Sequence, residues 1–456
     1  MKTEESIEPS YDSGRKSKTS TRRLWRDLTL LLVGTCILFG TAIGARDLWN
    51  PNEAIYGRAV VEMNERGDWL VPTVNGKVFA EKPILYYWGA LAASSAFGEI
   101  NELSLRVPSF IAGVLSVLLI YLLVQPYTGS RQALIAAALL ATQYEVFWSG
   151  RSVQMDILVL VTTLGMLLPL SRMLDFGLSP RWAWPTVGLV AGVGLLAKGP
   201  ITCIVPAAVF LSYCASRRLN PKIMNTGFPL ALLLSAVVAA TWYGALYLQG
   251  QSEVLKEVLY RQNFSRFSNA WDHVQPWWYY LKYFWIEFAP WALLVPAAIA
   301  LKTNGSKEFA LRRLAWGWIT VVIFFFSLSE SKRAPYILPG APAVAILSAA
   351  VIERLITGTL TALQRRTALG AFGLVSTLFS IGGIILWFSI PARYPDLGAE
   401  ARILSLVFIV SGLILLLAIA FHDDHKSFAP AALLAGTIAF YLTASIFVLP
   451  SMNERK

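Results

Sequence analysis

Apolar segments of roughly 20 residues follow one another along almost the whole chain, and they restrict its fold more than any other feature. A helix needs about 20 apolar residues to cross the hydrocarbon core of a bilayer, and lipid offers no hydrogen-bond partner to an open strand edge. The sequence therefore predicts an all-α, polytopic membrane protein with about 13 transmembrane helices. The predicted spans are residues 28–45, 104–125, 132–149, 154–171, 183–198, 200–214, 227–249, 277–301, 311–328, 336–353, 368–390, 403–421 and 428–449.

The composition excludes an ordinary soluble protein. Hydrophobic residues make up 55% of the 456 residues and charged residues 15%, whereas soluble domains are about 25% charged. The net charge of +11 could indicate nucleic-acid binding, but the basic residues are spread over short loops, so no nucleic-acid partner is expected. We expect one membrane domain at residues 28–450, between a basic tail at 1–27 and a short tail at 451–456.

The basic N-terminal tail predicts the orientation of the chain. The apolar segment after it has no signal-peptide cleavage site, so we expect an uncleaved first span with the tail in the cytoplasm. Alternate loops then face the cytoplasm and carry Lys and Arg, as the positive-inside rule requires. The loops on the opposite side are rich in carboxylates and aromatics, and we expect the functional site there. These loops are residues 46–103, 250–276, 329–335 and 391–402.

The first of these loops has local structure of its own. An amphipathic helix is expected over residues 53–66, and Gly67 should end it. After the turn WLVPTVNGKVF, a second amphipathic stretch over residues 83–97 should return to the membrane surface. That return brings Glu81 and Lys82 back near the first helix, where the charged groups could share a pocket.

Two carboxylates are candidates for catalysis. Glu53 lies in the first turn of the expected helix, where the helix dipole favours the ionised form, which suits a general base or a metal ligand. An ordinary helix-start residue in water is the alternative. Asp156 lies about one turn into an apolar span, where an unpaired carboxylate is costly and is rarely kept without a role or a partner. Arg151 could be a structural partner of this kind.

Several cations are candidates for binding a phosphate. Lys82, Lys198, Lys332 and Arg333 all fall at the non-cytoplasmic ends of predicted spans. Cations that converge at one place are what a phosphate group needs. Ordinary snorkelling at a helix end is the alternative, and for Lys198 alone it is the simpler one. Arg266 adds a further candidate for substrate binding.

The chain lacks several motifs of other membrane enzymes. It has no GxxxxGK[ST], GxSxG or HExxH sequence, which disfavours a nucleotide-driven pump and a protease. Its three cysteines and three histidines show no metal-ligand spacing. Carboxylates and cations at one membrane face fit group transfer from a lipid-linked phosphate, in which a base takes the proton of the acceptor hydroxyl and cations stabilise the departing phosphate.

A set of ordered motifs carries a resemblance to a known family. Over residues 24–450 the chain resembles the lipid A aminoarabinose transferase and protein O-mannosyltransferase-like glycosyltransferases of the GT-C class. The motifs are LWNPNEAIYGRAVVEMNERGDWLVPTVNGKVFAEKPILYYW from Leu48, the segment around Asp156, AKGP at 197–200, NFSRF followed by His273 and PWWYY, and SESKRAPYILPGAPA from Ser329.

This resemblance implies a substrate and a location. Such enzymes use a polyprenyl-phosphate sugar, in bacteria undecaprenyl phosphate, and act at the periplasmic face of the inner membrane, so residues 46–103 would be the first periplasmic catalytic loop. By resemblance, Lys82 and Tyr336 match positions at the donor phosphate, Glu81 matches a polar site residue, and Asp156 matches an essential acid.

The chain departs from the family pattern at a few positions. The usual Asp-Glu pair of the first loop is Asn52-Glu53 here, so either Glu53 or Asp156 would have to act as the base or the activity is altered. A usual Arg is replaced by Ile55, and Arg58 lies one turn further on as a substitute for substrate binding. Asn263 stands where aminoarabinose transferases have a His that can contribute to a metal site, so no metal is certain and a divalent metal stays an open alternative. The chain stops at Lys456, whereas many relatives continue into a soluble periplasmic domain.

The main hypothesis is a membrane glycosyltransferase that moves a sugar from a polyprenyl-phosphate donor to a lipid, glycan or protein acceptor. The alternatives are a non-catalytic binding or transport protein for polyprenyl-phosphate sugars and a scaffold subunit that keeps the fold. The enzyme hypothesis predicts that Glu53, Glu81, Lys82, Asp156 and Lys332 converge on one cavity.

Overall fold

The structure is a computed structural model that describes residues 13–49, 51–218, 227–265, 272–303 and 305–453. Within these ranges the chain is helical almost throughout, and β1 (Thr73–Val74) and β2 (Lys77–Val78) form the only sheet. The predicted all-α class is therefore confirmed. The helices are α1 (Ser13–Gly40), α2 (Pro51–Arg66), α3 (Leu85–Phe97), α4 (Glu102–Thr128), α5 (Ser130–Ala141), α6 (Tyr144–Ser149), α7 (Asp156–Phe176), α8 (Pro180–Lys198), α9 (Ile201–Ser216), α10 (Phe228–Leu248), α11 (Ser252–Lys256), η2 (Glu257–Ser265), α13 (Tyr279–Glu287), η3 (Trp291–Leu294), α14 (Val295–Ala298), α15 (Ser306–Leu328), η4 (Ala334–Gly340), α16 (Ala341–Thr357), α17 (Ala362–Arg393), η5 (Pro395–Leu397), α18 (Gly398–Ala420), α19 (Phe428–Thr443), η6 (Ala444–Val448) and α20 (Leu449–Ser451).

In the described part of the chain, eight helical segments are long and apolar enough to cross a membrane. They are α4, α7, α10, α15, η4 with α16, α17, η5 with α18, and α19 to α20. Each of the thirteen predicted spans overlaps helical residues, but two are interrupted. The predicted span 132–149 breaks at Thr142 and Gln143, between α5 and α6, and the predicted span 277–301 breaks at Pro290, which has no N–H to continue a helix. A polytopic membrane protein is confirmed, but the count of thirteen is not.

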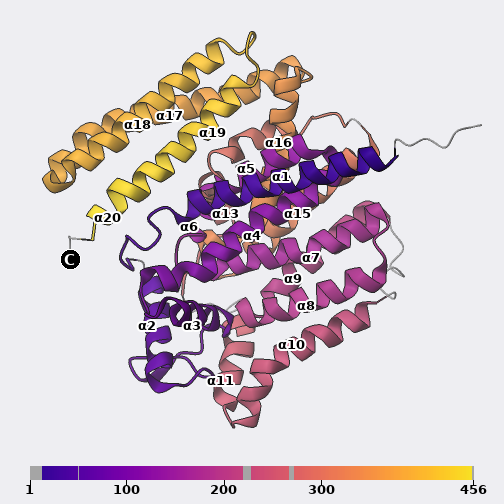
Figure 1. The fold of residues 1–456 in the computed structure, drawn as a ribbon, viewed down its shortest axis with the longest axis vertical. Coiled ribbons are helices and arrows are strands. Elements are labelled where there is room, and N and C mark those ends of the chain that lie inside the picture. Colours follow the sequence, from indigo (N-terminus) through magenta and orange to yellow (C-terminus); the bar gives the residue numbers. More distant parts are fainter. Residues whose placement is uncertain (1–12, 50, 219–226, 266–271, 304, 454–456) are drawn as a thin grey trace, which may run out of the picture.

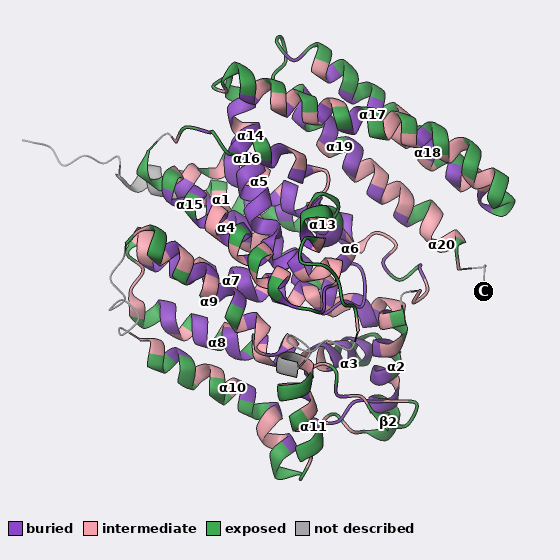
Figure 2. Ribbon diagram, turned by 180° about the vertical axis from the view of Figure 1, so that it is seen from behind, coloured by how far each residue is buried: buried purple, intermediate pink, exposed green. Residues whose placement is uncertain are grey.

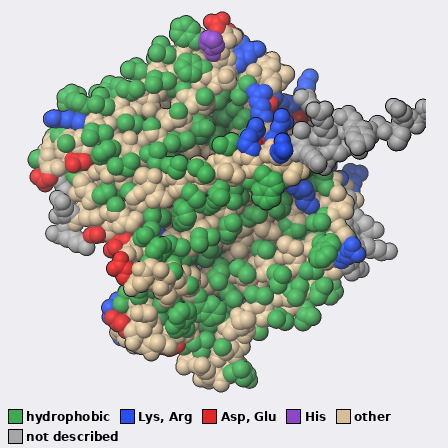
Figure 3. Space-filling model, in the orientation of Figure 1, with side chains coloured by type: hydrophobic (Ala, Val, Ile, Leu, Met, Phe, Trp, Pro, Cys, Tyr) green, Lys and Arg blue, Asp and Glu red, His purple; other side chains and the backbone are tan. Residues whose placement is uncertain are grey.

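The long helices lie side by side in layers (Figure 1). α8 packs between α7 and α10, and α18 packs against both α17 and α19 in a layer at the opposite edge of the molecule. Figure 2 shows α16 as a deeply buried helix at the centre, whereas α17 and α18 keep large exposed faces. Hydrophobic side chains are spread over the whole face shown in Figure 3, which suits contact with lipid.

α2, the β-hairpin and α3 lie together at one end of the bundle (Figure 1). Gly67, with a φ of +62°, ends α2 as predicted. Asn75 and Gly76 both have positive φ, which is the conformation of a tight two-residue hairpin turn, and they connect β1 to the antiparallel β2. α3 confirms the second helix expected in this loop, and it leaves Glu81 and Lys82 in the connection just before it.

Glu62 fastens the hairpin to α2. Its carboxylate accepts hydrogen bonds from Thr73 Oγ1 at 2.6 Å and from the backbone amides of Asn75 at 2.6 Å and Gly76 at 3.2 Å. Arg58 Nε donates to the same carboxylate at 2.8 Å. The hydrogen bond from Thr73, with those from the two amides and Arg58, lowers the pKa of Glu62 from 4.5 to about 2.

We expect the hairpin to detach from α2 in acid. Because folding lowers the pKa of Glu62, its stabilising contribution is complete above pH 4.5 and is lost as the pH falls toward about 2. Hydrogen exchange, corrected for the intrinsic rate, should show the protection of the Asn75 and Gly76 amides falling across this window. In Glu62→Gln, protection should be weaker at neutral pH and nearly independent of pH. An equally steep loss in that variant would show that another group controls the hairpin.

Candidate active site

A cavity of about 840 Å³, counted with the space through which it opens to the outside, lies at one end of the helical bundle. The start of α7, the connection between α8 and α9, and the last turn of α15 line it. The connection before α3, η2 and η4 complete its wall. Its polar lining includes the side chains of five predicted site residues, Glu81, Lys82, Asp156, Lys198 and Tyr336. Much of the remaining lining is apolar, with Val159, Ile201, Phe325 and Phe326. One opening therefore combines acids, cations and an apolar wall.

Asp156 and Lys198 form an ion pair in this cavity. Asp156 is the first residue of α7 and Lys198 the last of α8, so each charge lies at the helix end that the helix dipole favours. Lys198 Nζ pairs with Asp156 Oδ1 and lies 5.0 Å from the centre of the Tyr336 ring. Gln154 Nε2 donates to the other oxygen, Asp156 Oδ2, at 3.1 Å. The carboxylate is therefore held by a donor on each oxygen.

Two further cations act on Asp156 from other elements. Lys82, in the connection before α3, and Arg333, just before η4, both interact electrostatically with the Asp156 carboxylate. Arg333 also reaches α2, where the Asn52 amide, oriented so that both groups are satisfied, accepts from its Nη2 at 2.5 Å and its Nη1 at 3.2 Å. Burial, with the nearby charges of Glu81 and Asp156, raises the pKa of Tyr56 on α2 above its ordinary value, so this phenol stays neutral.

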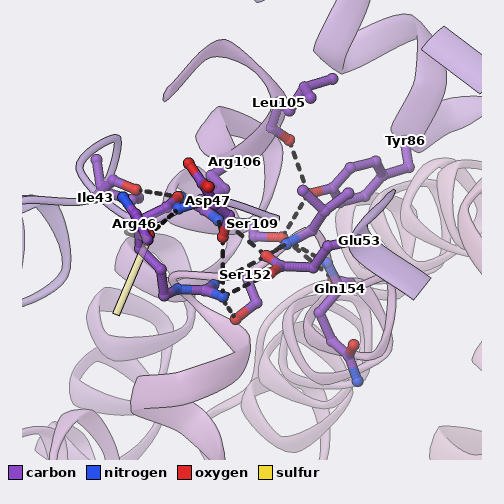
Figure 4. Close-up of polar contacts among 12 residues, drawn as sticks. Ile43, Arg46, Asp47, Glu53, Tyr86, Leu105, Arg106, Ser109, Ser152 and Gln154 are labelled. Atoms are coloured by element: carbon purple, nitrogen blue, oxygen red, sulfur yellow. Dashed lines mark hydrogen bonds and ion pairs between the residues drawn. The ribbon is translucent and has the colours of Figure 1, made fainter. Parts of the chain in front are cut away.

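Glu53 lies outside the cavity, in a buried network shown in Figure 4. Arg46 Nη1 donates to Glu53 Oε2 at 2.7 Å, and Arg46 Nη2 donates to Oε1 at 3.1 Å. Arg106 Nε donates to Oε1 at 3.3 Å, and the backbone N–H of Val153 donates to Oε1 at 2.8 Å. Two guanidinium groups therefore hold the carboxylate, which joins α2 to α4 and to the segment before Asp156.

Arg106 fixes the segment that follows α1. This side chain is fully buried, and its Nη1 donates to the carbonyls of Ile43 at 2.7 Å and Arg46 at 2.6 Å, while its Nη2 donates to Asp47 at 3.0 Å. Arg106 and Glu53 thus form the centre of a polar joint between the first loop and the membrane helices (Figure 4). This network holds the segment before Asp156 in place through the contact of Glu53 with Val153.

Sequence comparison finds relatives for most of the chain. Residues 81–244 match the family described as dolichyl-phosphate-mannose-protein mannosyltransferase. The undecaprenyl phosphate-alpha-4-amino-4-deoxy-L-arabinose arabinosyl transferase 2 of Pseudomonas fluorescens is 28% identical over 417 residues, which are 89% of this chain and 69% of that protein. The arabinosyl transferase of Aeromonas salmonicida with the same donor in its name is 30% identical over 336 residues, which are 72% of this chain and 61% of that protein.

Structural comparison gives the fold. ArnT from Cupriavidus metallidurans in the apo state has a TM-score of 0.72 at 20% identity, covering 92% of this chain and 77% of ArnT. The crystal structure of the same enzyme bound to undecaprenyl phosphate has a TM-score of 0.71 at 19% identity, covering 91% and 77%. The chain therefore has the GT-C fold of ArnT, and its sequence is similar to arabinosyl transferases along most of its length. The resemblance inferred from the ordered motifs is confirmed.

The GT-C fold of this chain brings some predicted site residues together and leaves others outside. Glu81, Lys82 and Asp156, three of the five residues expected to converge, line the cavity with Lys198 and Tyr336, and Arg333 lies close to it. Glu53 does not line it. Arg58 contacts Glu62 and is half exposed, so its contact supports the hairpin. Arg266 lies outside the described residues.

Lys332 also lies outside the lining of the cavity. Its buried ammonium donates to the backbone carbonyls of Gln275, at 3.0 Å, and Ser329. Its backbone N–H donates to His273 at 2.9 Å, so residues 273–275 are joined to the segment before η4. Burial lowers the pKa of Lys332. These contacts favour a structural role for Lys332 in connecting the two segments.

The structure adds two residues that the sequence analysis did not single out. Arg106 lies near the start of α4 and is the third residue of the predicted span 104–125, so the rule that selected Asp156 would have selected it. Gln154 offers no such signal, because a lone polar residue beside a span end is common and its contact with Asp156 depends on the tertiary fold.

The described residues offer no ready metal site. No group of three or more His, Cys, Asp or Glu side chains among them is placed to hold a metal ion. The cavity lining holds two acids, Glu81 and Asp156, and Asp156 pairs with Lys198 and accepts from Gln154. The donor set therefore does not fit a divalent metal, and no step below depends on one.

Proposed function

We propose that this chain transfers a sugar from an undecaprenyl-phosphate-linked donor to an acceptor hydroxyl of a lipid, glycan or protein. The observation that carries the proposal is the cavity in which the Asp156–Lys198 pair, Lys82 and Tyr336 share one opening with an apolar wall. The names of the relatives described above and a ligand-bound structure of the same fold both specify undecaprenyl phosphate, which supports this donor.

Lys82, Lys198 and Tyr336 are proposed to bind the donor phosphate. Two ammonium groups and a phenol offer charge-assisted hydrogen bonds to the phosphate oxygens. The first isoprene units would lie against Ile201 and Phe325, which line the same cavity. This arrangement keeps the charged head at the end of the membrane helices and the isoprenoid chain in an apolar environment.

Asp156 is proposed as the general base, and Lys198 as the cation that controls it. Before the donor binds, Lys198 holds Asp156 in an ion pair. When Lys198 moves from Asp156 to the donor phosphate, the Asp156 carboxylate becomes available to the acceptor. The acceptor proton moves to Asp156, the acceptor oxygen bonds to the anomeric carbon, and the bond between that carbon and the phosphate oxygen breaks. The electron pair leaves with undecaprenyl phosphate, whose charge the cations stabilise.

The orientation of the chain is also part of the proposal. We place the basic tail in the cytoplasm, the cavity at the periplasmic face, and residues 28–450 in one transferase domain with 46–103 as its catalytic loop. In Figure 3, Lys and Arg side chains gather near the end where α1 begins, and acidic side chains lie near the end that holds α2. This distribution supports an N-terminal end in the cytoplasm.

Replacing Lys82 with Met should weaken donor binding. A hydrogen bond to a charged group contributes about 1.5 to 3 kcal/mol, so the KM for the donor should rise about 10- to 100-fold, with a smaller change in kcat. Lys77→Met is the matched control, because Lys77 is an exposed lysine of β2 in the same loop and should leave the KM unchanged. An unchanged KM in Lys82→Met would remove Lys82 from the phosphate site.

The proposed function itself is tested with the purified full chain in proteoliposomes. A panel of undecaprenyl-phosphate-linked sugars is offered with lipid, glycan and protein acceptors, and both labelled product and released undecaprenyl phosphate are measured. We expect one of the donors to give labelled product and released undecaprenyl phosphate in equal amounts. Tight binding of the donors without turnover on any acceptor would instead support the binding or transport alternative.

A further inference from the structure

Gln154 contacts the proposed base from the side opposite Lys198. Its Nε2 donates to Asp156 Oδ2 at 3.1 Å, whereas Lys198 pairs with Asp156 Oδ1. Gln154 is 8% exposed, so this hydrogen bond is formed largely out of contact with water. The two oxygens of Asp156 therefore have different donors, the Lys198 ammonium on one and a buried neutral amide on the other.

Ser109 on α4 holds the backbone of Gln154 in place by hydrogen bonds. The N–H of Gln154 donates to Ser109 Oγ at 3.3 Å, and Ser109 Oγ donates to the carbonyl of Gln154 at 3.2 Å. Ser109 Oγ also lies 2.8 Å from Tyr86 Oη, and Tyr86 donates to the carbonyl of Leu105 at 3.1 Å. Ser109 and Tyr86 are both fully buried, and Figure 4 shows their contacts. The backbone of Gln154 is thus fixed relative to α4.

The residue before Gln154 is fixed from α2. The N–H of Val153 donates to Glu53 Oε1 at 2.8 Å, and Arg46 and Arg106 hold Glu53 in place. Two consecutive residues before Asp156 are therefore tied to two different helices. The backbone position from which the Gln154 side chain reaches Asp156 is therefore fixed.

We propose that Gln154 is a positioning residue of the transfer reaction, which orients Asp156 once Lys198 has moved to the donor phosphate. This inference rests on the proposed function. When Lys198 leaves, Gln154 keeps Oδ2 in place, and Oδ1, the oxygen that Lys198 has vacated, faces the acceptor and takes its proton. A neutral amide suits this role, because it fixes the carboxylate without forming a competing ion pair.

The test compares Gln154→Met with the wild-type full chain in proteoliposomes. Met has a similar length and no hydrogen-bond donor, so Asp156 should lose its orientation while the cations of the phosphate site stay in place. We expect kcat to fall about 10- to 100-fold, as for a misplaced catalytic group. The KM for the donor, the Kd for undecaprenyl phosphate and the Tm should stay close to wild type.

Gln364→Met provides the matched control. Gln364 is 7% exposed, and its Nε2 donates to a backbone carbonyl, that of Ala300, at 2.8 Å, far from the cavity lining. Its kcat should be unchanged. An unchanged kcat in Gln154→Met, with turnover in the wild type, would overturn the inference alone. Parallel losses of kcat, undecaprenyl phosphate binding and Tm would overturn it in favour of a purely structural role. A wild type without turnover would overturn the proposed function and this inference with it.

Discussion

Replacing Asp156 with Asn should lower kcat for sugar transfer by about 100- to 10,000-fold, the usual contribution of a general base. Asn has nearly the same shape and still accepts a hydrogen bond, but it cannot take a proton from the acceptor. Binding of undecaprenyl phosphate should persist, because Lys82, Lys198 and Tyr336 remain and Lys198 loses its competing partner. Single-turnover transfer and equilibrium binding, measured on the same preparation, separate the two effects.

Asp175→Asn is the matched control for this experiment. Asp175 lies near the other end of the same helix α7 and accepts from Tyr127 at 2.5 Å, Tyr213 at 2.7 Å and Arg217. Its loss should lower the Tm and leave the transfer rate of the folded protein close to wild type. If Asp156→Asn retained more than about a tenth of wild-type kcat, Asp156 would not be the base.

Replacing Glu53 with Ala should lower the free energy of unfolding by about 3 to 5 kcal/mol, because it leaves two buried guanidinium groups without their carboxylate. Glu53 is 1% exposed, Arg46 5% and Arg106 0%, so water cannot readily replace the lost partner. Chemical denaturation in detergent, followed by tryptophan fluorescence, measures the change. Little or no change would show that the network in Figure 4 does not stabilise the fold.

Glu53→Gln separates positioning from catalysis. The amide oxygen can still accept from Val153, so the folded fraction of this variant should keep a kcat within about tenfold of wild type, although it should be less stable. A variant with wild-type stability and a kcat as low as that of Asp156→Asn would identify Glu53 as a catalytic base. The carboxylate would then have to leave both arginines during the reaction.

The sequence predicted those structural elements whose conformation depends mainly on neighbouring residues in the chain. The apolar runs, the end of α2 at Gly67, the turn within WLVPTVNGKVF and α3 all depend on residues close together in the sequence. Asp156 was found because a carboxylate inside an apolar run is costly wherever the run folds. These elements are confirmed, and Asp156 lines the cavity.

The partners of the charged residues could not be predicted in the same way. Glu53 meets Arg106 across 53 residues of sequence, and only the packing of α2 against α4 shows that the pair is buried. Lys332 lies at the end of a predicted span, as a phosphate-binding lysine would. Its ammonium instead donates hydrogen bonds to the backbone carbonyls of Gln275 and Ser329. The interruption between α5 and α6 depends on a tertiary contact as well, since Gln143 Nε2 at the break donates to Ala341 at 3.0 Å.

A structure of the full chain with undecaprenyl phosphate tests the central claim most directly. The account predicts density for the phosphate within hydrogen-bond distance of Lys82, Lys198 and Tyr336, with the Lys198–Asp156 pair opened and Gln154 still bound to Asp156. Phosphate density elsewhere, with that ion pair intact and the cavity holding no ligand, would contradict it.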